Sequence, residues 1–169
     1  MPSAPLRTLL AAVAAAAVLI TTACTPVDSG TGGGTFGGAL AGGYGWNRTQ
    51  TDNARLIVQV GREMGVPRYG QQIALATAMQ ESKLTNLSGG PDDSAGLFQQ
   101  RPSQGWGTYR QVTTPRYAAH KFYAALLEVP EWQVRPVYDA AQAVQRSCCP
   151  LLYQQWAPEA RRLRDAVTG

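Results

Sequence analysis

The chain has few residues of the kinds that hold metal ions. It contains one His and three Cys among its 169 residues. The single His has no Cys, Asp or Glu cluster beside it with the spacing of a metal-binding motif. The sequence therefore favours no metal centre, and it indicates no cofactor.

Runs of basic residues are also missing. The net charge is only +4, and no stretch of Lys and Arg alternates with aromatic residues. A nucleic-acid partner is therefore not indicated. A mild positive charge suits an anionic polymer such as a bacterial cell wall, but it is equally consistent with ordinary solubility.

No hydrophobic run is long enough to span a bilayer comfortably. The longest is a run of 12 apolar residues, Leu9–Ile20, which follows a short segment that carries Arg7. This arrangement is typical of a secretory signal peptide, which we expect over residues 1–23. The chain is therefore predicted to be exported.

Cys24 follows the small residue Ala23, as in a bacterial lipobox, although Thr21 stands where that motif usually has Leu. We expect lipidation of Cys24, which would anchor the protein at the outer face of the cytoplasmic membrane or the cell wall. The alternative is a soluble secreted protein. Residues 24–46 are predicted to form a flexible tether, because nine of the sixteen residues in 30–45 are Gly.

Residues 47–169 are predicted to form one mainly helical domain. Hydrophobic residues recur there at helical spacing, and capping residues and prolines punctuate the pattern. The first helix is expected to be capped by Asp52 and to stop at Gly65. The later helices are expected over about 69–82, from Pro115, from near Pro136, and over about 150–167 with a kink or restart at Pro158.

The stretch from Asn86 to Val112 breaks the helical pattern. It is rich in Gly, Ser, Asp and Pro, which predicts turns or a short β-ribbon. Long irregular loops in small domains are usually functional or disordered, and the hydrophobic Leu97, Phe98 and Trp106 argue against disorder. Trp106 is a candidate for stacking on a sugar face, although it could equally fill the core from a loop.

Glu81 is an unusual residue for its position. It lies in the largely small and apolar segment "ALATAMQESKL", at the exit of the second predicted helix and at the edge of the irregular loop. A carboxyl shielded from water resists ionisation, and a carboxylic acid that stays protonated can donate a proton to a leaving oxygen. The alternative is that Glu81 lies in solvent at a helix end.

The motifs around Glu81 resemble those of the lysozyme-like superfamily, and within it the soluble lytic transglycosylases. Glu81-Ser82 matches the "ES" that ends a helix in that family. Gly96–Gln99, "GLFQ", matches its "GLMQ" segment, with Phe98 in place of Met and Pro102 three residues after it. The chain resembles actinobacterial exported domains of this kind even more closely, over about 53–163.

The resemblance implies an α+β lysozyme-like fold with a cleft that binds peptidoglycan glycan strands. Glu81 would be the general acid and then the base, giving an anhydro product. Ser82 and Gln99 would orient the acid or the substrate. Gln100, Trp106, Tyr153 and Asp93 complete the predicted substrate-binding set. The protein is expected to act as a monomer.

Two departures from the family pattern keep alternatives open. The family's third motif, "AYN", is replaced by Ala143-Val144-Gln145, so its Tyr is absent and Tyr153 is the nearby candidate to replace it. Asp92 or Asp93 could act as a second carboxylate in a lysozyme-type hydrolase, or could simply cap a turn. A third possibility is a peptidoglycan-binding module without catalysis.

Overall fold

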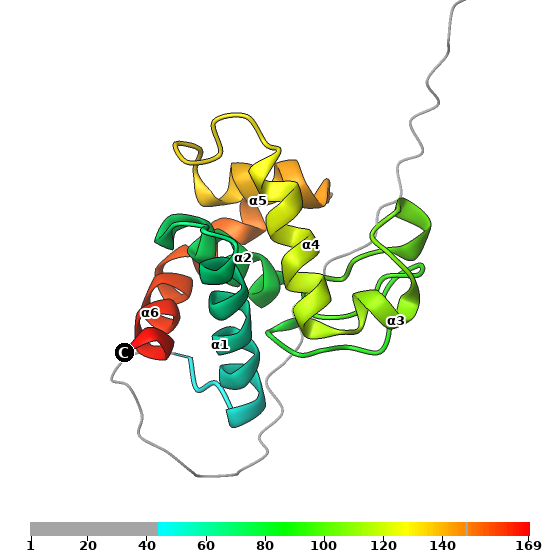
Figure 1. Cartoon of the computed structure of the whole chain (residues 1–169), viewed down its shortest axis with the longest axis horizontal. Helices are drawn as coiled ribbons and strands as arrows, with labels where there is room; N and C mark the ends of the chain where they lie inside the picture. The colour runs from blue at the N-terminus through cyan, green and yellow to red at the C-terminus, as the bar shows by residue number, and fades with distance from the viewer. Residues whose placement is uncertain (1–43, 148) are drawn as a thin grey trace, which may run out of the picture. The chain divides into compact units, whose positions relative to one another are not determined.

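Helix α2 (Arg68–Ser82) lies at the centre of the fold. In the computed structural model, which describes residues 44–147 and 149–169, most of α2 is buried, including every residue of 73–79. The middle of the helix is therefore buried on all sides, unlike that of an amphipathic surface helix. Around it pack α1 (Arg48–Glu63), α4 (Pro115–Leu127), α5 (Val137–Gln145), the 3-10 helix η2 (Pro150–Trp156) and α6 (Ala157–Thr168) (Figure 1).

The described residues all belong to one compact, mainly helical unit, as predicted. The expected signal peptide, Cys24, residues 24–43 of the tether and Cys148 lie outside the described residues. Within the described part, no helix combines the length and the apolar character needed to cross a membrane.

The predicted start of the first helix is wrong. Asn47, not Asp52, is the N-cap of α1: its side chain accepts from the Gln50 N–H at 2.9 Å, and the Gln50 side chain accepts from the Asn47 N–H at 3.0 Å. This reciprocal capping box satisfies two N–H groups at the helix start. Asp52 lies inside the helix, where it pairs with Arg55.

The other predicted helix boundaries are confirmed to within a residue or two. Pro115 is the first residue of α4, and Pro136 directly precedes α5. The last predicted helix is divided in two: η2 ends at Trp156, and α6 begins at Ala157, next to Pro158. Proline at a first helical turn has no N–H that needs a partner, which explains these starts.

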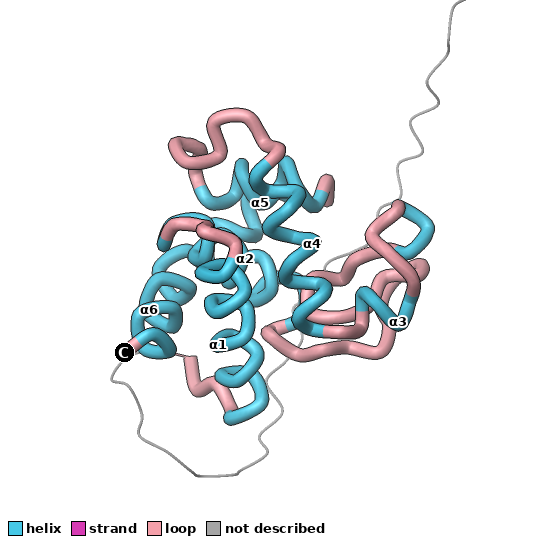
Figure 2. Tube along the Cα trace, in the orientation of Figure 1, coloured by secondary structure: helices cyan, strands magenta, loops and turns pink. Residues whose placement is uncertain are grey.

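The connection between α2 and α4 is irregular, as predicted (Figure 2). It contains only the short helices η1 (Pro102–Gln104) and α3 (Tyr109–Val112), and the expected β-ribbon is reduced to one antiparallel bridge between Ala95 and Gln100. Left-handed residues at Gly96 (φ 79°) and Gln99 (φ 46°) interrupt the extended backbone that a longer ribbon would need.

The described part of the chain begins with an aromatic clasp, formed by Tyr44, Trp46 and Trp156. The Tyr44 and Trp156 ring centroids lie 4.9 Å apart, and those of Trp46 and Trp156 lie 6.2 Å apart. Trp46 also donates its indole N–H to Glu159 of α6 at 2.9 Å. Trp46, which was expected to be the last residue of the tether, therefore packs on the helical domain.

Candidate functional site

Helix α2 carries Glu81 from the core to the surface. Met79, two residues before Glu81, is fully buried. Glu81 itself is half-buried, and Lys83, just beyond the helix, is exposed. The carboxyl of Glu81 thus lies where the apolar interior meets solvent. This is the placement that the sequence predicts for a carboxylic acid with a perturbed pKa.

Tyr153 contacts Glu81 directly. Its phenol O–H donates to Glu81 Oε1 at 2.6 Å, across 72 residues of sequence. Tyr153 lies on η2 and is only 1% exposed, so its ring is fixed by the core. The structure thus brings together two of the residues predicted for the site.

Gln145 also acts on Glu81. It is the last residue of α5, its side chain lowers the pKa of the Glu81 carboxyl as a hydrogen-bond partner, and its Nε2 donates to the backbone oxygen of Phe98 at 2.7 Å. The amide therefore connects the acid to the "GLFQ" segment. Gln145 occupies the third position of the segment that replaces the family's "AYN".

The pKa of Glu81 is raised above its ordinary value. Burial is the main cause, because it disfavours the charged carboxylate. The hydrogen bonds from Tyr153 and Gln145 and the positive charge of Lys83 act in the opposite direction, since each stabilises the carboxylate. Burial wins, and the protonated form persists to a higher pH than in an exposed Glu.

The chain turns sharply directly after the Glu81-Ser82 pair. Lys83 (φ 53°) and Leu84 (φ 59°) are both left-handed, a conformation that costs a non-glycine residue about 1–2 kcal/mol. Two side-chain amides from α1 hold the turn: Gln50 Nε2 donates to Lys83 O and Asn53 Nδ2 donates to Leu84 O, each at 2.8 Å. The turn places the Lys83 ammonium 4.1 Å from the centroid of the Trp156 ring.

Ser82 is buried and bonds to backbone carbonyls. Its hydroxyl, predicted to orient the acid or the substrate, donates to Leu97 O at 2.7 Å and lies 3.1 Å from Ala78 O, and the residue is buried. These bonds fasten the "GLFQ" segment to the end of α2. Ser82 thus supports the site through the backbone rather than facing it.

Gln99 and Gln100 point in different directions. Gln99 is half-buried and bonds within the loop, accepting from Ser94 at 3.0 Å and donating to Gly96 O at 3.1 Å. Gln100 is 1% exposed and donates to Ala118 O of α4 at 3.1 Å. A side chain buried in this way is not accessible to a glycan, so Gln100 is a core residue in this structure.

Trp106 is half-buried and packs against the hydrophobic core. Tyr117 Oη donates to the Trp106 carbonyl at 3.3 Å, which ties the loop to α4. The structure thus places Trp106 between the two roles that the sequence leaves open, with part of its ring exposed and part packed.

Asp93 is engaged by its own loop. Its carboxylate accepts from Arg101 Nε at 2.9 Å, from the Ser103 N–H at 2.7 Å and from the Ser103 hydroxyl at 2.9 Å. These bonds, chiefly that from the Ser103 N–H, lower the pKa of Asp93 to about 2. Arg101 also pairs with Asp92 at 3.0 Å, so both carboxylates serve to shape the loop.

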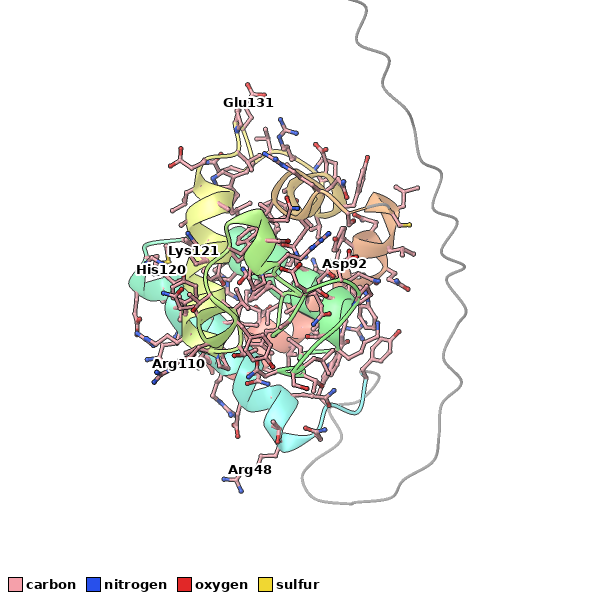
Figure 3. The ribbon with its side chains drawn as sticks, turned by 90° about the vertical axis from the view of Figure 1, so that its right-hand side faces the viewer. Arg48, Asp92, Arg110, His120, Lys121 and Glu131 are labelled. Atoms are coloured by element: carbon pink, nitrogen blue, oxygen red, sulfur yellow. The ribbon has the colours of Figure 1, made fainter. Side chains whose placement is uncertain are left out.

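The single His is not near these carboxylates. Figure 3 shows His120 and Lys121 together on α4, on the opposite side of the view from Asp92. No group of three or more His, Cys, Asp and Glu within the described ranges could hold a metal ion.

Sequence reasoning missed Gln145 and Lys83 as neighbours of Glu81. Gln145 aligns with the Asn of "AYN", and a polar side chain at that position is the signal by which it could have been found. Lys83 gives no such signal, since an exposed Lys after a helix is ordinary. Its position depends on the left-handed turn.

No protein-family model matches the chain, and no curated protein matches it in sequence. The case for a function therefore rests on the geometry of the site and on the motifs themselves.

Proposed function

We propose that the chain is a lytic transglycosylase with a lysozyme-like α+β fold that cleaves the glycan strands of peptidoglycan, with Glu81 as its catalytic acid and base. The observation that carries the proposal is the half-buried Glu81 carboxyl with the Tyr153 phenol 2.6 Å away. The "ES" and "GLFQ" motifs add support, because Ser82 joins them through its bond to Leu97 O.

In the first step, Glu81 donates its proton to the glycosidic oxygen as the C1–O bond breaks. This requires a carboxyl that is protonated near neutral pH, and the raised pKa of Glu81 supports that state. The leaving sugar departs with a hydroxyl group. Glu81 is then a carboxylate, which the hydrogen bonds of Tyr153 and Gln145 stabilise.

In the second step, the same carboxylate removes a proton from the C6 hydroxyl of the muramic sugar. The hydroxyl oxygen then bonds to C1, which closes a 1,6-anhydro ring and returns the proton to Glu81. No water is consumed, and one carboxyl serves both steps. The carboxylates of Asp92 and Asp93 are committed to Arg101 and Ser103, which favours this route over a two-carboxylate hydrolase.

The remaining parts of the proposal concern location. A signal peptide over 1–23, lipidation at Cys24 and a tether would hold the enzyme at the outer face of the membrane, within reach of the wall. Exposed parts of Gln99 and Trp106 are the proposed contacts for the sugar chain, since both side chains are partly open to solvent.

The test uses purified peptidoglycan, the wild-type chain and its Glu81→Gln variant. Loss of a general acid lowers the rate by about 10²–10⁴-fold. We expect the wild type to release anhydro-muropeptides, identified by mass spectrometry, and the variant to release almost none. Glu128→Gln is the matched control, because it makes the same change at an exposed glutamate at the end of α4 and should retain turnover.

Other outcomes assign the protein differently. Products with a reducing end would mean that water is the acceptor and that the protein is a hydrolase. Binding to peptidoglycan without any release above the level of the variant would overturn the enzyme and leave a binding module.

A further inference from the structure

The chain has two lysines, Lys83 and Lys121, and the first has an unusual setting. Helices that end in a left-handed residue usually have Gly there, because Gly adopts that conformation without strain. At the end of α2 the position is occupied by Lys83, and Leu84 after it is left-handed as well. A strained backbone that persists next to a candidate site suggests that the side chain it positions is used.

The surroundings hold this turn in place from several sides. Gln50 and Asn53 of α1 bind the carbonyls of Lys83 and Leu84. The N–H of Lys83 donates to Met79 O at 3.1 Å, and the N–H of Leu84 donates to Ala78 O at 3.2 Å. All four backbone polar groups of the turn are therefore satisfied, and the Lys83 side chain leaves it in a defined direction.

That direction leads to the indole of Trp156. The Lys83 ammonium lies 4.1 Å from the ring centroid, well within the range of a cation–π contact. Trp156 is itself fixed, because its indole N–H donates to Gln80 Oε1 at 2.8 Å. Gln80 and Lys83 flank Glu81-Ser82 in sequence, so the residues on both sides of this pair contact the same indole.

We propose that Lys83 is a positioning residue for Glu81: its ammonium, fixed by Trp156 and the left-handed turn, stabilises the carboxylate that remains after Glu81 has given up its proton. The proposal rests on the function proposed above for its catalytic meaning. The other groups that act on the Glu81 carboxyl are Tyr153 from η2 and Gln145 from α5, both uncharged near neutral pH. Lys83 thus supplies the formal positive charge at the site.

The Coulomb interaction between Lys83 and Glu81 acts on both groups. The positive charge of Lys83 lowers the pKa of Glu81 against the effect of burial, and the Glu81 carboxylate raises the pKa of Lys83 while partial burial lowers it. Without the ammonium, burial would act on Glu81 with less opposition. The acid would then give up its proton less readily in the first step.

The test is a titration of the Glu81 side-chain carboxyl by ¹³C NMR in the full chain. Lys83→Met keeps the aliphatic contact with Trp156 but removes the charge, and we expect its Glu81 midpoint to move to higher pH. Lys83→Arg keeps the charge and the cation–π contact, so its midpoint should stay near that of the wild type. Lys121→Met, which removes the other lysine from α4, should leave the midpoint unchanged.

A thermal melt of each variant separates this role from a structural one. Lys83→Gly removes the ammonium but relieves the left-handed strain, so we expect its Tm to equal or exceed that of the wild type while its Glu81 midpoint rises as in Lys83→Met. Coincident midpoints in wild type and Lys83→Met would overturn the proposal. So would an equal shift in Lys83→Met and Lys83→Arg.

The titration requires no turnover, so it stands apart from the test of the proposed function. If the wild type cleaves no peptidoglycan but the Glu81 midpoint rises in Lys83→Met, Lys83 acts on Glu81 and the proposed enzyme activity is wrong. A chain that releases anhydro-muropeptides but shows no shift keeps the function and loses this role for Lys83.

Discussion

Glu81 is a carboxyl on which burial and polar neighbours act in opposite directions. Burial favours the protonated acid, while Tyr153, Gln145 and Lys83 favour the carboxylate. A group that must first give and then take a proton benefits from such a balance, because neither form is strongly trapped. The four residues come from three elements: the end of α2, the end of α5, and η2.

Removing the Tyr153 hydroxyl should move this balance toward the protonated acid. A hydrogen bond to a charged group contributes about 1.5–3 kcal/mol, so Tyr153→Phe should slow the acid step, which leaves Glu81 as a carboxylate, by about 10–100-fold. The pKa of Glu81 should rise. Rates of anhydro-muropeptide release as a function of pH, with ¹³C NMR of Glu81, measure both effects.

Tyr138→Phe is the matched control, because Tyr138 is a half-buried tyrosine of α5. It should retain the wild-type rate. Equal rates in Tyr153→Phe and wild type would show that the hydrogen bond of Tyr153 has no part in the reaction.

At the level of elements, the loop between α2 and α4 is held by contacts that fix its path over the end of α2. Gly96 is closely surrounded: it is left-handed, and its N–H donates to Leu87 O at 2.8 Å. A Cβ at this position would overlap the backbone oxygen of Val112. The path of the "GLFQ" segment therefore depends on this glycine.

Gly96→Ala should destabilise the fold by at least about 2 kcal/mol, from left-handed strain and from the overlap with a backbone atom that cannot rotate away. Urea unfolding measures the loss. Gly89→Ala is the control in the same loop: its Cβ would meet nothing within 4 Å, and its effect should stay within about 0.5 kcal/mol. A loss of stability in Gly96→Ala as small as that in Gly89→Ala would mean that the loop accommodates the new Cβ by moving.

The sequence predicts elements better than side-chain directions. Pro115, Pro136 and Pro158 mark helix starts because proline acts locally, and the structure confirms them. The start of α1 was missed because Asn47 and Asp52 are both good capping residues, and only the partner Gln50 distinguishes them.

The site was predictable only in part, for a related reason. Glu81 follows from its apolar helix, and Tyr153 was the nearby candidate to replace the missing family Tyr. Ser82 and Gln100 look like ligand-facing polar residues in sequence. In the structure both side chains are buried and donate hydrogen bonds to backbone carbonyls. Which way such a side chain turns is decided by long-range packing, which sequence spacing does not contain.

For the whole molecule, two carboxyls should make stability depend on pH with opposite signs. The folded-state pKa of Glu81 is raised, so its stabilising contribution is present at low pH and is lost as pH rises through that value. The pKa of Asp93 is lowered from 3.8 to about 2, so its contribution is present above 3.8 and is lost as pH falls toward about 2.

Glu81→Gln should therefore raise the Tm at pH 7 and have a smaller effect below pH 4.5, where the carboxyl is protonated in both states. Asp93→Asn should lower the Tm at pH 7, and the loss should shrink as pH approaches 2. Melts of both variants across this range give the measurement. Parallel curves for the two variants would contradict the assigned signs.

The aromatic clasp has a mechanical consequence. A pull on the chain at Tyr44 loads the Trp156 indole, against which Tyr44 and Trp46 pack. The same indole contacts the Lys83 ammonium and bonds to Gln80, the residues on either side of Glu81-Ser82. If the proposed tether is under tension, the load falls first on the indole that both neighbours of the Glu81-Ser82 pair contact.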